Sequence, residues 1–303
     1  MASLLPSATE LCYRLGVEPV GVSHSCDYPP AARDRPVLTS TAVDHGPDVS
    51  AEAIDEQVQS VEGSTYEVDD ALLASLDPDV VLTQATCDVC AVDETDVRTA
   101  VDDHGIEARV VTLDPHALSD VIDDVRRVGA ALDRSGTAAE VVDDLTARID
   151  RVASRASAAV DDAGRPRTLV LDWTAPPMVA GHWIPGMVAT AGGAYGLREP
   201  GEASEPVEWA AVREYDPEVL VVAPCGFDLE RAVGAVDDLR ERPGWTGLSA
   251  VEEDRVYAAD GSGHFNRPGP RLVDSLEALA ACVHPEAFEA DPAVVRRIGR
   301  AVA

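Results

Sequence analysis

Two segments of the chain repeat the same order of residues, and they limit the folds that it can adopt. Residues 77–82 read DPDVVL, and residues 216–222 read DPEVLVV. In each segment a proline marks the end of a helical pattern, and the apolar run that follows suits a buried strand. Helices that alternate with buried strands are typical of a parallel sheet covered on both faces. The sequence therefore predicts two α/β lobes built on one plan.

The stretch between these lobes has a different character. Residues 118–163 contain no strand pattern and no proline, and their apolar residues recur at helical spacing. They predict one long helix, or two helices joined near Gly136. We expect an N-terminal lobe at residues 1–117, a connecting helix at 118–163 and a C-terminal lobe at 164–303. The predicted fold class is α/β, with two Rossmann-like lobes joined by a long backbone helix and a ligand cleft between them.

The charge of the chain excludes one class of partner. It has 55 acidic residues against 24 basic ones, every basic residue is arginine, and the net charge is −31. So negative a surface repels phosphate backbones, and we expect no nucleic acid partner. A strongly hydrated acidic surface also suits high salt, where screening relieves self-repulsion.

The first residues and the length of the apolar runs indicate where in the cell the protein is located. No apolar run approaches the roughly 18 to 20 residues that cross a bilayer. Residues 1–6 (MASLLP) show neither the basic region nor the long apolar region of a secretory signal. We expect a cytoplasmic monomer as the sequence is written, or a protein at the cell surface or membrane if its true start lies upstream.

Candidate ligand contacts follow the predicted strands. Ligands of parallel sheets bind beyond the carboxyl ends of the strands, and the loops at these ends carry aromatic, acidic and histidine side chains. Aromatic rings could hold a planar ligand, and an arginine could hold its carboxylate or amide oxygens. The same aromatic residues could instead fill the seam between the lobes. The candidates are His24, Cys26, Asp27, Tyr28, Gln84, Asp172, Trp173, His182, Trp183, Phe227, His264, Phe265, Asn266 and Arg267.

Four cysteines also lie after predicted strands. Cys87 and Cys90 are three positions apart, and Cys26 and Cys225 follow two other strands. Four thiolates suit zinc or an iron–sulfur cluster, so these residues are candidate metal ligands. The alternatives are a redox pair, or small apolar residues that bind no metal.

Several short motifs resemble a known family. The sequence is similar to the cobalamin-type periplasmic-binding proteins, which are the substrate-binding components of importers for vitamin B12 and iron complexes. The resemblance implies two α/β lobes bridged by a long helix, a ligand held between them, and no catalysis. It also implies membrane subunits of an ABC importer as partners. The motifs are residues 3–10 (SLLPSATE), 21–23 (GVS), 27–30 (DYPP), 77–82 (DPDVVL), 176–177 (PP) with Gly181, and 265–271 (FNRPGPR).

Two positions differ from typical corrinoid binders of this family. Gln84 stands where those proteins have an aromatic residue, and Cys26 adds a thiol to the loop before DYPP. The favoured hypothesis is an importer's substrate-binding protein that holds a corrinoid or another metal chelate in the cleft without catalysis. The alternative is a cytoplasmic metal or iron–sulfur protein, possibly an enzyme, that uses the cysteines.

Overall fold

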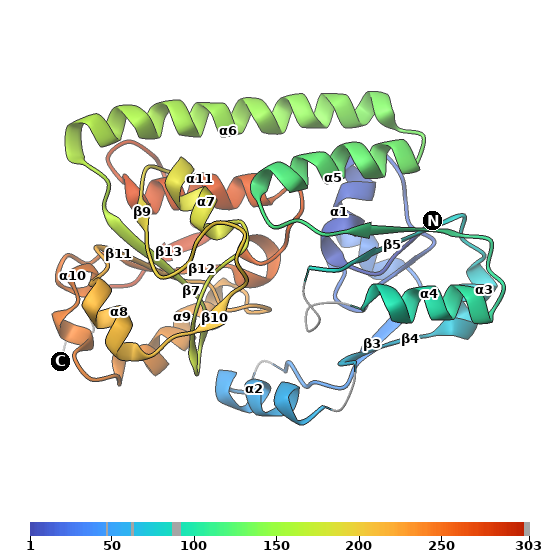
Figure 1. The fold of residues 1–303 in the computed structure, drawn as a ribbon, viewed down its shortest axis with the longest axis horizontal. Helices are drawn as coiled ribbons and strands as arrows, with labels where there is room; N and C mark the ends of the chain where they lie inside the picture. Colours follow the sequence, from blue (N-terminus) through green and yellow to red (C-terminus); the bar gives the residue numbers. More distant parts are fainter. Residues whose placement is uncertain (47, 62–63, 87–91, 300–303) are drawn as a thin grey trace. The chain divides into compact units, whose positions relative to one another are not determined.

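The computed structural model describes residues 1–46, 48–61, 64–86 and 92–299 (Figure 1). The chain divides into two compact units. The first comprises Met1–Val49, Ala53–Pro115 and Ser119–Leu145, and the second comprises Ser50–Glu52, His116–Leu118 and Thr146–Ala303. The division predicted at residues 117 and 163 stays a prediction. Among the described residues, no helix combines the length and apolar content that a bilayer crossing requires.

The first unit is built on a four-stranded parallel sheet in the order β2-β1-β5-β6. A separate antiparallel pair, β3 and β4, lies outside this sheet. Side chains of α3 and α4 pack against β1 and β5 and form a core. The elements are β1 (Ala2–Ser3), α1 (Pro6–Arg14), β2 (Gly21–Val22), β3 (Thr39–Thr41), α2 (Ala51–Ser60), β4 (Tyr66–Val68), α3 (Asp70–Leu76), β5 (Val80–Gln84), α4 (Glu94–Asp103) and β6 (Arg109–Leu113).

The second unit contains a seven-stranded mixed sheet in the order β10-β8-β7-β11-β12-β13, with β9 also paired to β7. Strands β7, β9, β11 and β12 are parallel, whereas β8, β10 and β13 pair antiparallel to their neighbours, and β10 and β13 end the order. The predicted parallel arrangement is confirmed for the inner strands. The strands are β7 (Arg167–Thr174), β8 (Pro177–Val179), β9 (Ala194–Tyr195), β10 (Glu205–Pro206), β11 (Val219–Val222), β12 (Val256–Ala259) and β13 (Val295–Arg297).

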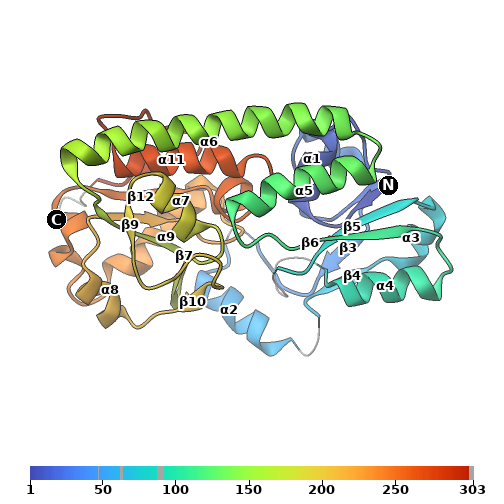
Figure 2. The same cartoon turned by 45° about the horizontal axis from the view of Figure 1, so that its top comes forward.

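Helices cover both faces of this sheet (Figures 1 and 2). Alternate residues of the inner strands, such as Leu169 and Leu171, join the side chains of α8 and α9 in one core. Helices α7 and α11 pack against each other, and α11 also contacts β11. The apolar runs of β7 and β11 are thus buried on both faces, as a covered sheet requires. The helices are α7 (Ile184–Thr190), α8 (Trp209–Tyr215), α9 (Leu229–Arg240), α10 (Ser249–Glu252) and α11 (Leu272–Val283).

The repeated acidic-proline segment has the same structural role in both units. Asp77 ends α3 with a φ of 42°, and Asp216 ends α8 with a φ of 48°. Aspartate tolerates this left-handed conformation better than most residues. In each case the following proline leads directly into a central strand, β5 or β11. The motif therefore stops a helix and starts a strand.

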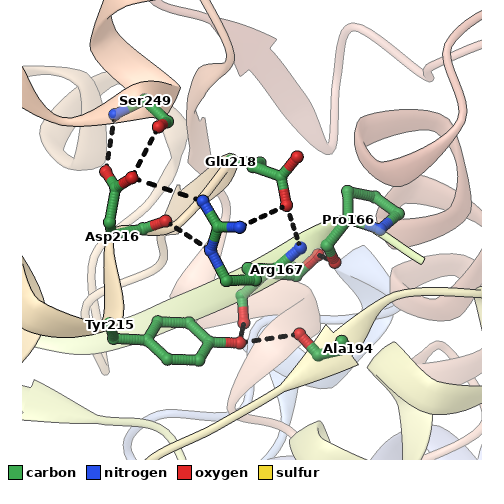
Figure 3. Close-up of polar contacts among 8 residues, drawn as sticks. Pro166, Arg167, Ala194, Tyr215, Asp216, Glu218 and Ser249 are labelled. Atoms are coloured by element: carbon green, nitrogen blue, oxygen red, sulfur yellow. Dashed lines mark hydrogen bonds and ion pairs between the residues drawn. The ribbon is translucent and has the colours of Figure 1, made fainter. Parts of the chain in front are cut away.

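A polar network closes the amino-terminal end of the second sheet (Figure 3). The Arg167 Nε donates to the backbone oxygen of Asp216 at 2.8 Å, and the Arg167 backbone N–H donates to Glu218 Oε2 at 2.9 Å. The Asp216 carboxylate in turn accepts hydrogen bonds from the backbone N–H and hydroxyl of Ser249. The Tyr215 hydroxyl donates to the backbone oxygen of Ala194 at 2.8 Å. These groups are paired within the protein and connect the starts of β7, β9 and β11.

The segment without strand patterns forms two helices, α5 (Leu118–Ala131) and α6 (Ser135–Ala163). The two helices pack closely, because a Cβ on Gly129 would lie 2.3 Å from the Cβ of Ala138. The first part of α6 belongs to the first unit, where Asp144 pairs with Arg14 of α1 at 2.7 Å. The later part belongs to the second unit, where Arg148 pairs with Glu277 of α11 at 2.6 Å.

A buried carboxylate in α5 leads to a prediction about stability. The side chain of Asp124 is 6% exposed, and burial raises its pKa to about 7 despite the Arg127 guanidinium at 3.1 Å. The folded chain keeps this proton up to about pH 7, whereas the unfolded chain loses it near the ordinary aspartate pKa of 3.8. The carboxylate therefore destabilises the fold progressively as pH rises between these values.

We expect Asp124→Asn to raise the free energy of unfolding at pH 8 by about 1–2 kcal/mol, after allowance for solvent screening. At pH 4 the gain should largely vanish. Urea unfolding at both pH values measures this difference. The matched control is Asp123→Asn, because Asp123 is exposed and pairs with Arg126. Equal stability of the two variants at pH 8 would contradict the prediction.

Candidate functional site

The carboxyl ends of three parallel strands lie at one edge of the second unit's sheet. β11 pairs in parallel register with both β7 and β12, so the residues that follow these strands share that edge. This is where ligands of parallel sheets bind. We call the described residues 172–174, 223–228 and 260–267 the strand-end edge. It contains seven of the fourteen candidate ligand contacts.

Asp172 is the central acid of the strand-end edge. The register of β7 against β8 shifts between Leu171 and Trp173, so Asp172 lies in a β-bulge. Bulges commonly redirect a side chain near a functional site. Asp172 Oδ2 accepts a hydrogen bond from the Ser204 hydroxyl, whereas Oδ1 is buried and has no hydrogen-bond partner among the described residues. Burial raises the pKa of Asp172 to about 6, so the group is mostly ionised at neutral pH.

The loop after β11 adds a thiol and an aromatic ring. Cys225 is exposed, and its backbone N–H donates to the Asp172 carbonyl at 3.0 Å. Phe227 is buried and meets Trp173 edge to face, with ring centroids 5.4 Å apart. The Arg231 guanidinium lies 3.7 Å from the centroid of the Phe227 ring. In this structure Trp173 and Phe227 therefore form a buried aromatic pair beneath the edge.

The loop after β12 is held by its own polar contacts. Burial acts to raise the pKa of Asp260, but hydrogen bonds from His264 and the Gly263 N–H outweigh it and lower the pKa. The Asp260–His264 contact is 2.6 Å long, and Asn266 Nδ2 donates to the backbone oxygen of Ala223 at 2.8 Å. Arg267 is buried. Neighbouring strand-end loops are thus fixed to each other.

Phe265 and Trp183 link this loop to the segment after β8. The Phe265 side chain is 0% exposed, and its backbone oxygen accepts a hydrogen bond from Trp183 Nε1 at 2.9 Å. Trp183 is buried as well, and its ring stacks on His182 at 5.5 Å. The His182 ring also meets His116, which follows β6. The sequence analysis missed His116, although its position directly after a strand and a proline could have indicated it.

The remaining candidates lie in the first unit. The Thr9 hydroxyl donates to Ser3 Oγ at 2.8 Å and lies 3.1 Å from the buried Cys26 sulfur. His24 Nδ1 lies 2.8 Å from the Thr39 hydroxyl, and the His24 ring stacks on Tyr66 at 5.6 Å. The other three candidates differ in exposure: Gln84 is buried, Asp27 is partly exposed and Tyr28 is exposed.

The metal prediction receives no support from the described residues. Cys87 and Cys90 lie outside them, Cys26 belongs to the first unit and Cys225 to the second. Among the described residues, no group of three or more His, Cys, Asp or Glu side chains could hold a metal ion. Zinc or iron–sulfur binding by the four cysteines stays a prediction.

Comparisons with known proteins place these features in context. A family described as periplasmic binding protein matches residues 1–262. An uncharacterized ABC transporter substrate-binding lipoprotein of Bacillus subtilis is 24% identical over 297 residues, which cover 95% of this chain and 81% of that protein.

Solved structures show the same fold. A periplasmic heme binding protein from Pseudomonas aeruginosa has a TM-score of 0.71 and 21% identity, covering 98% of each chain. The periplasmic vitamin B12 binding protein of Vibrio cholerae has a TM-score of 0.65 and 18% identity, covering 93% of this chain and 95% of that one. The predicted fold class is confirmed as the two-lobed α/β fold of periplasmic binding proteins of class III.

These findings correct two expectations. The cytoplasmic location is wrong, because the matching family is periplasmic and the curated relative is a lipoprotein. The alternative of a metal or iron–sulfur enzyme that uses the cysteines is not favoured, because the family consists of binding proteins without catalytic activity.

Proposed function

The chain belongs to the family of periplasmic binding proteins, and we propose on this basis that it is the substrate-binding component of an ABC-type importer. It binds a metal chelate, works outside the cytoplasmic membrane as a monomer, and delivers the chelate to the membrane subunits without changing it. The heme and vitamin B12 binding proteins that share its fold support a metal chelate as the ligand class.

One observation carries this proposal, namely the unpaired buried oxygen of Asp172 at the strand-end edge. A buried carboxylate oxygen that accepts no hydrogen bond destabilises the folded state. We infer that a bound ligand supplies the missing donor. The amino-terminal end of the same sheet is closed by the contacts of Arg167 and Asp216. We therefore infer that the ligand binds at the strand-end edge of the second unit.

We propose a corrinoid as the chelate that fits best. Corrinoids carry amide side chains, whose N–H groups can donate to the free oxygen of Asp172. Heme carries two carboxylates, which an ionised buried acid repels. The residues that resemble the cobalamin-type family include the segment 265–271, which begins at this edge.

Titration of the purified chain with cyanocobalamin and with hemin, followed by tryptophan fluorescence, tests the proposal. We expect one corrinoid per chain with a dissociation constant in the micromolar range or tighter. If only hemin binds, the choice of corrinoid is wrong. If neither chelate binds at high micromolar concentration, the proposal that the ligand is a heme- or corrinoid-type chelate is wrong.

Asp172→Asn separates binding from folding. The variant keeps an acceptor for the Ser204 hydroxyl but removes the buried charge, so the free energy of unfolding at pH 8 should rise or stay constant. Corrinoid affinity should fall by on the order of tenfold, because a hydrogen bond to a charged group is lost. The control is Asp228→Asn, an exposed N-cap of α9 at the same edge, since asparagine caps equally well. Equal affinity of both variants would rule out a direct contact with Asp172.

A further inference from the structure

Two histidine rings meet in the second unit. The Nδ1 atoms of His116 and His182 lie 3.4 Å apart, the ring centroids are 5.5 Å apart, and the ring planes are inclined by 41°. Both residues are partly exposed, so a small solute can reach them. His116 lies in the turn before α5, and His182 lies in the turn between β8 and α7.

The separation of the two nitrogens matches the geometry of a metal site. Imidazole nitrogens bind zinc at about 2.0–2.1 Å, and a tetrahedral angle then places two of them about 3.3 Å apart. The observed 3.4 Å is close to this value. Imidazole is a preferred ligand of zinc, copper and nickel. An ion could therefore bridge the pair with only a small movement of the rings.

The backbone of His182 is held in an unusual conformation. Its φ is 49°, which is uncommon for a residue other than glycine. Its N–H donates to the carbonyl of Glu202 at 2.5 Å, and its carbonyl accepts from the Gly201 N–H at 3.0 Å. The Trp183 ring stacks on the imidazole, with planes inclined by 29°. Residues held in sparsely populated backbone conformations are found frequently at ligand-binding sites.

The fixed position of His182 lowers the conformational entropy that is lost when a metal ion binds. Free histidine side chains lose rotational freedom when they ligate an ion. His182 has already lost most of this freedom, because its backbone and one ring face are fixed. Binding groups that are held in position before the ligand arrives bind it more tightly than mobile ones.

We propose that His116 and His182 bind a divalent transition-metal ion of the zinc, nickel or copper class through their Nδ1 atoms. Because no group of three or more potential ligands occurs in the described part of the chain, water fills the remaining positions. The site goes beyond the proposed transport function. A planar macrocycle leaves its metal open only on opposite faces, so the ring lies between its two axial ligands. Two imidazoles in contact cannot both ligate such a metal.

The contact also has an explanation that needs no metal. One neutral imidazole can donate its Nδ1 hydrogen to the Nδ1 atom of the other. A metal titration separates the two explanations, because only a metal site gives a saturable signal that depends on both rings.

Cobalt(II) is the probe, since its visible absorption is strong in tetrahedral sites and weak in six-coordinate oxygen sites. The natural chain and a Cys87→Ser/Cys90→Ser variant are titrated in parallel, and the histidine variants are made in both. His116→Gln removes one ring. His182→Asn removes the other while tolerating the left-handed backbone. The control is His104→Gln, because His104 is exposed at the end of α4.

We expect one cobalt ion with strong visible absorption in both parent chains. Each of His116→Gln and His182→Asn should weaken cobalt binding by at least about tenfold. Loss of a residue that merely orients a metal ligand already lowers metal affinity by about this factor, and loss of the ligand itself should lower it at least as much. His104→Gln should leave it unchanged. Zinc should raise the melting temperature of the parent chains but not of the two variants. Unchanged cobalt affinity in both variants would overturn the proposal, and so would loss of the signal in the cysteine variant.

Discussion

Replacement of Gly181 by alanine should lower the free energy of unfolding by about 3 kcal/mol. A Cβ at this position would lie 2.2 Å from the backbone oxygen of Glu202 and 2.6 Å from the backbone nitrogen of Ser204. Backbone atoms cannot move aside as a flexible side chain can, so the segment that holds His182 must shift. Gly181 also donates its N–H to the Ser204 hydroxyl at 3.0 Å, and Ser204 pairs with Asp172. We therefore expect weaker corrinoid binding as well.

Gly186→Ala is the matched control, only five residues away. Gly186 lies in α7, and a Cβ there would meet no atom within 4 Å. Alanine favours the helix, so this variant should be as stable as the natural chain or up to about 1 kcal/mol more stable. Urea unfolding of both variants gives the comparison. Similar stabilities would mean that the segment at residues 201–204 does not pack against Gly181 as described.

Phe265→Ala should lower the free energy of unfolding by about 3–5 kcal/mol. The Phe265 ring is completely buried, and the loop that carries it supplies the acceptor for Trp183 Nε1. Removal of the ring leaves a cavity at the strand-end edge. Thermal or urea unfolding measures the loss.

The control is Phe288→Ala, because Phe288 is only partly buried. Its ring stacks under the Arg155 guanidinium at 5.0 Å and lines an open pocket of about 520 Å³. This variant should lose no more than about half as much stability. If Phe265→Ala is the milder change, Phe265 is not a core residue.

The repeated acidic-proline segments explain how much of the fold could be predicted. Their order of helix end, proline and buried strand is a local property, and Asp77 and Asp216 adopt the same backbone conformation. Helical spacing likewise indicated α5 and α6. The strands β8, β10 and β13 were not predicted, because they have only two or three residues and pair at the sheet margin. A strand of two or three residues is too short to show an alternation of apolar and polar residues. Its pairing depends on neighbours that are distant in sequence.

The candidate site shows a different limit. The sequence indicated which loops follow parallel strands, and Asp172 does lie at such an edge. It did not indicate which side chains point into the core. Phe265 is fully buried and Trp183 nearly so, because large aromatic rings gain most from removal from water. His116 was missed since its partner, His182, is 66 positions away in the chain.

Amide hydrogen exchange in the presence and absence of cyanocobalamin is the most direct test of ligand binding at the strand-end edge. Saturating corrinoid should slow the exchange of residues 172–174, 223–228 and 260–267. The amides near Arg167 and Asp216, at the closed end of the sheet, should exchange at an unchanged rate. Protection confined to that closed end, or no protection at saturating corrinoid, would contradict a chelate site at the carboxyl ends of β7, β11 and β12.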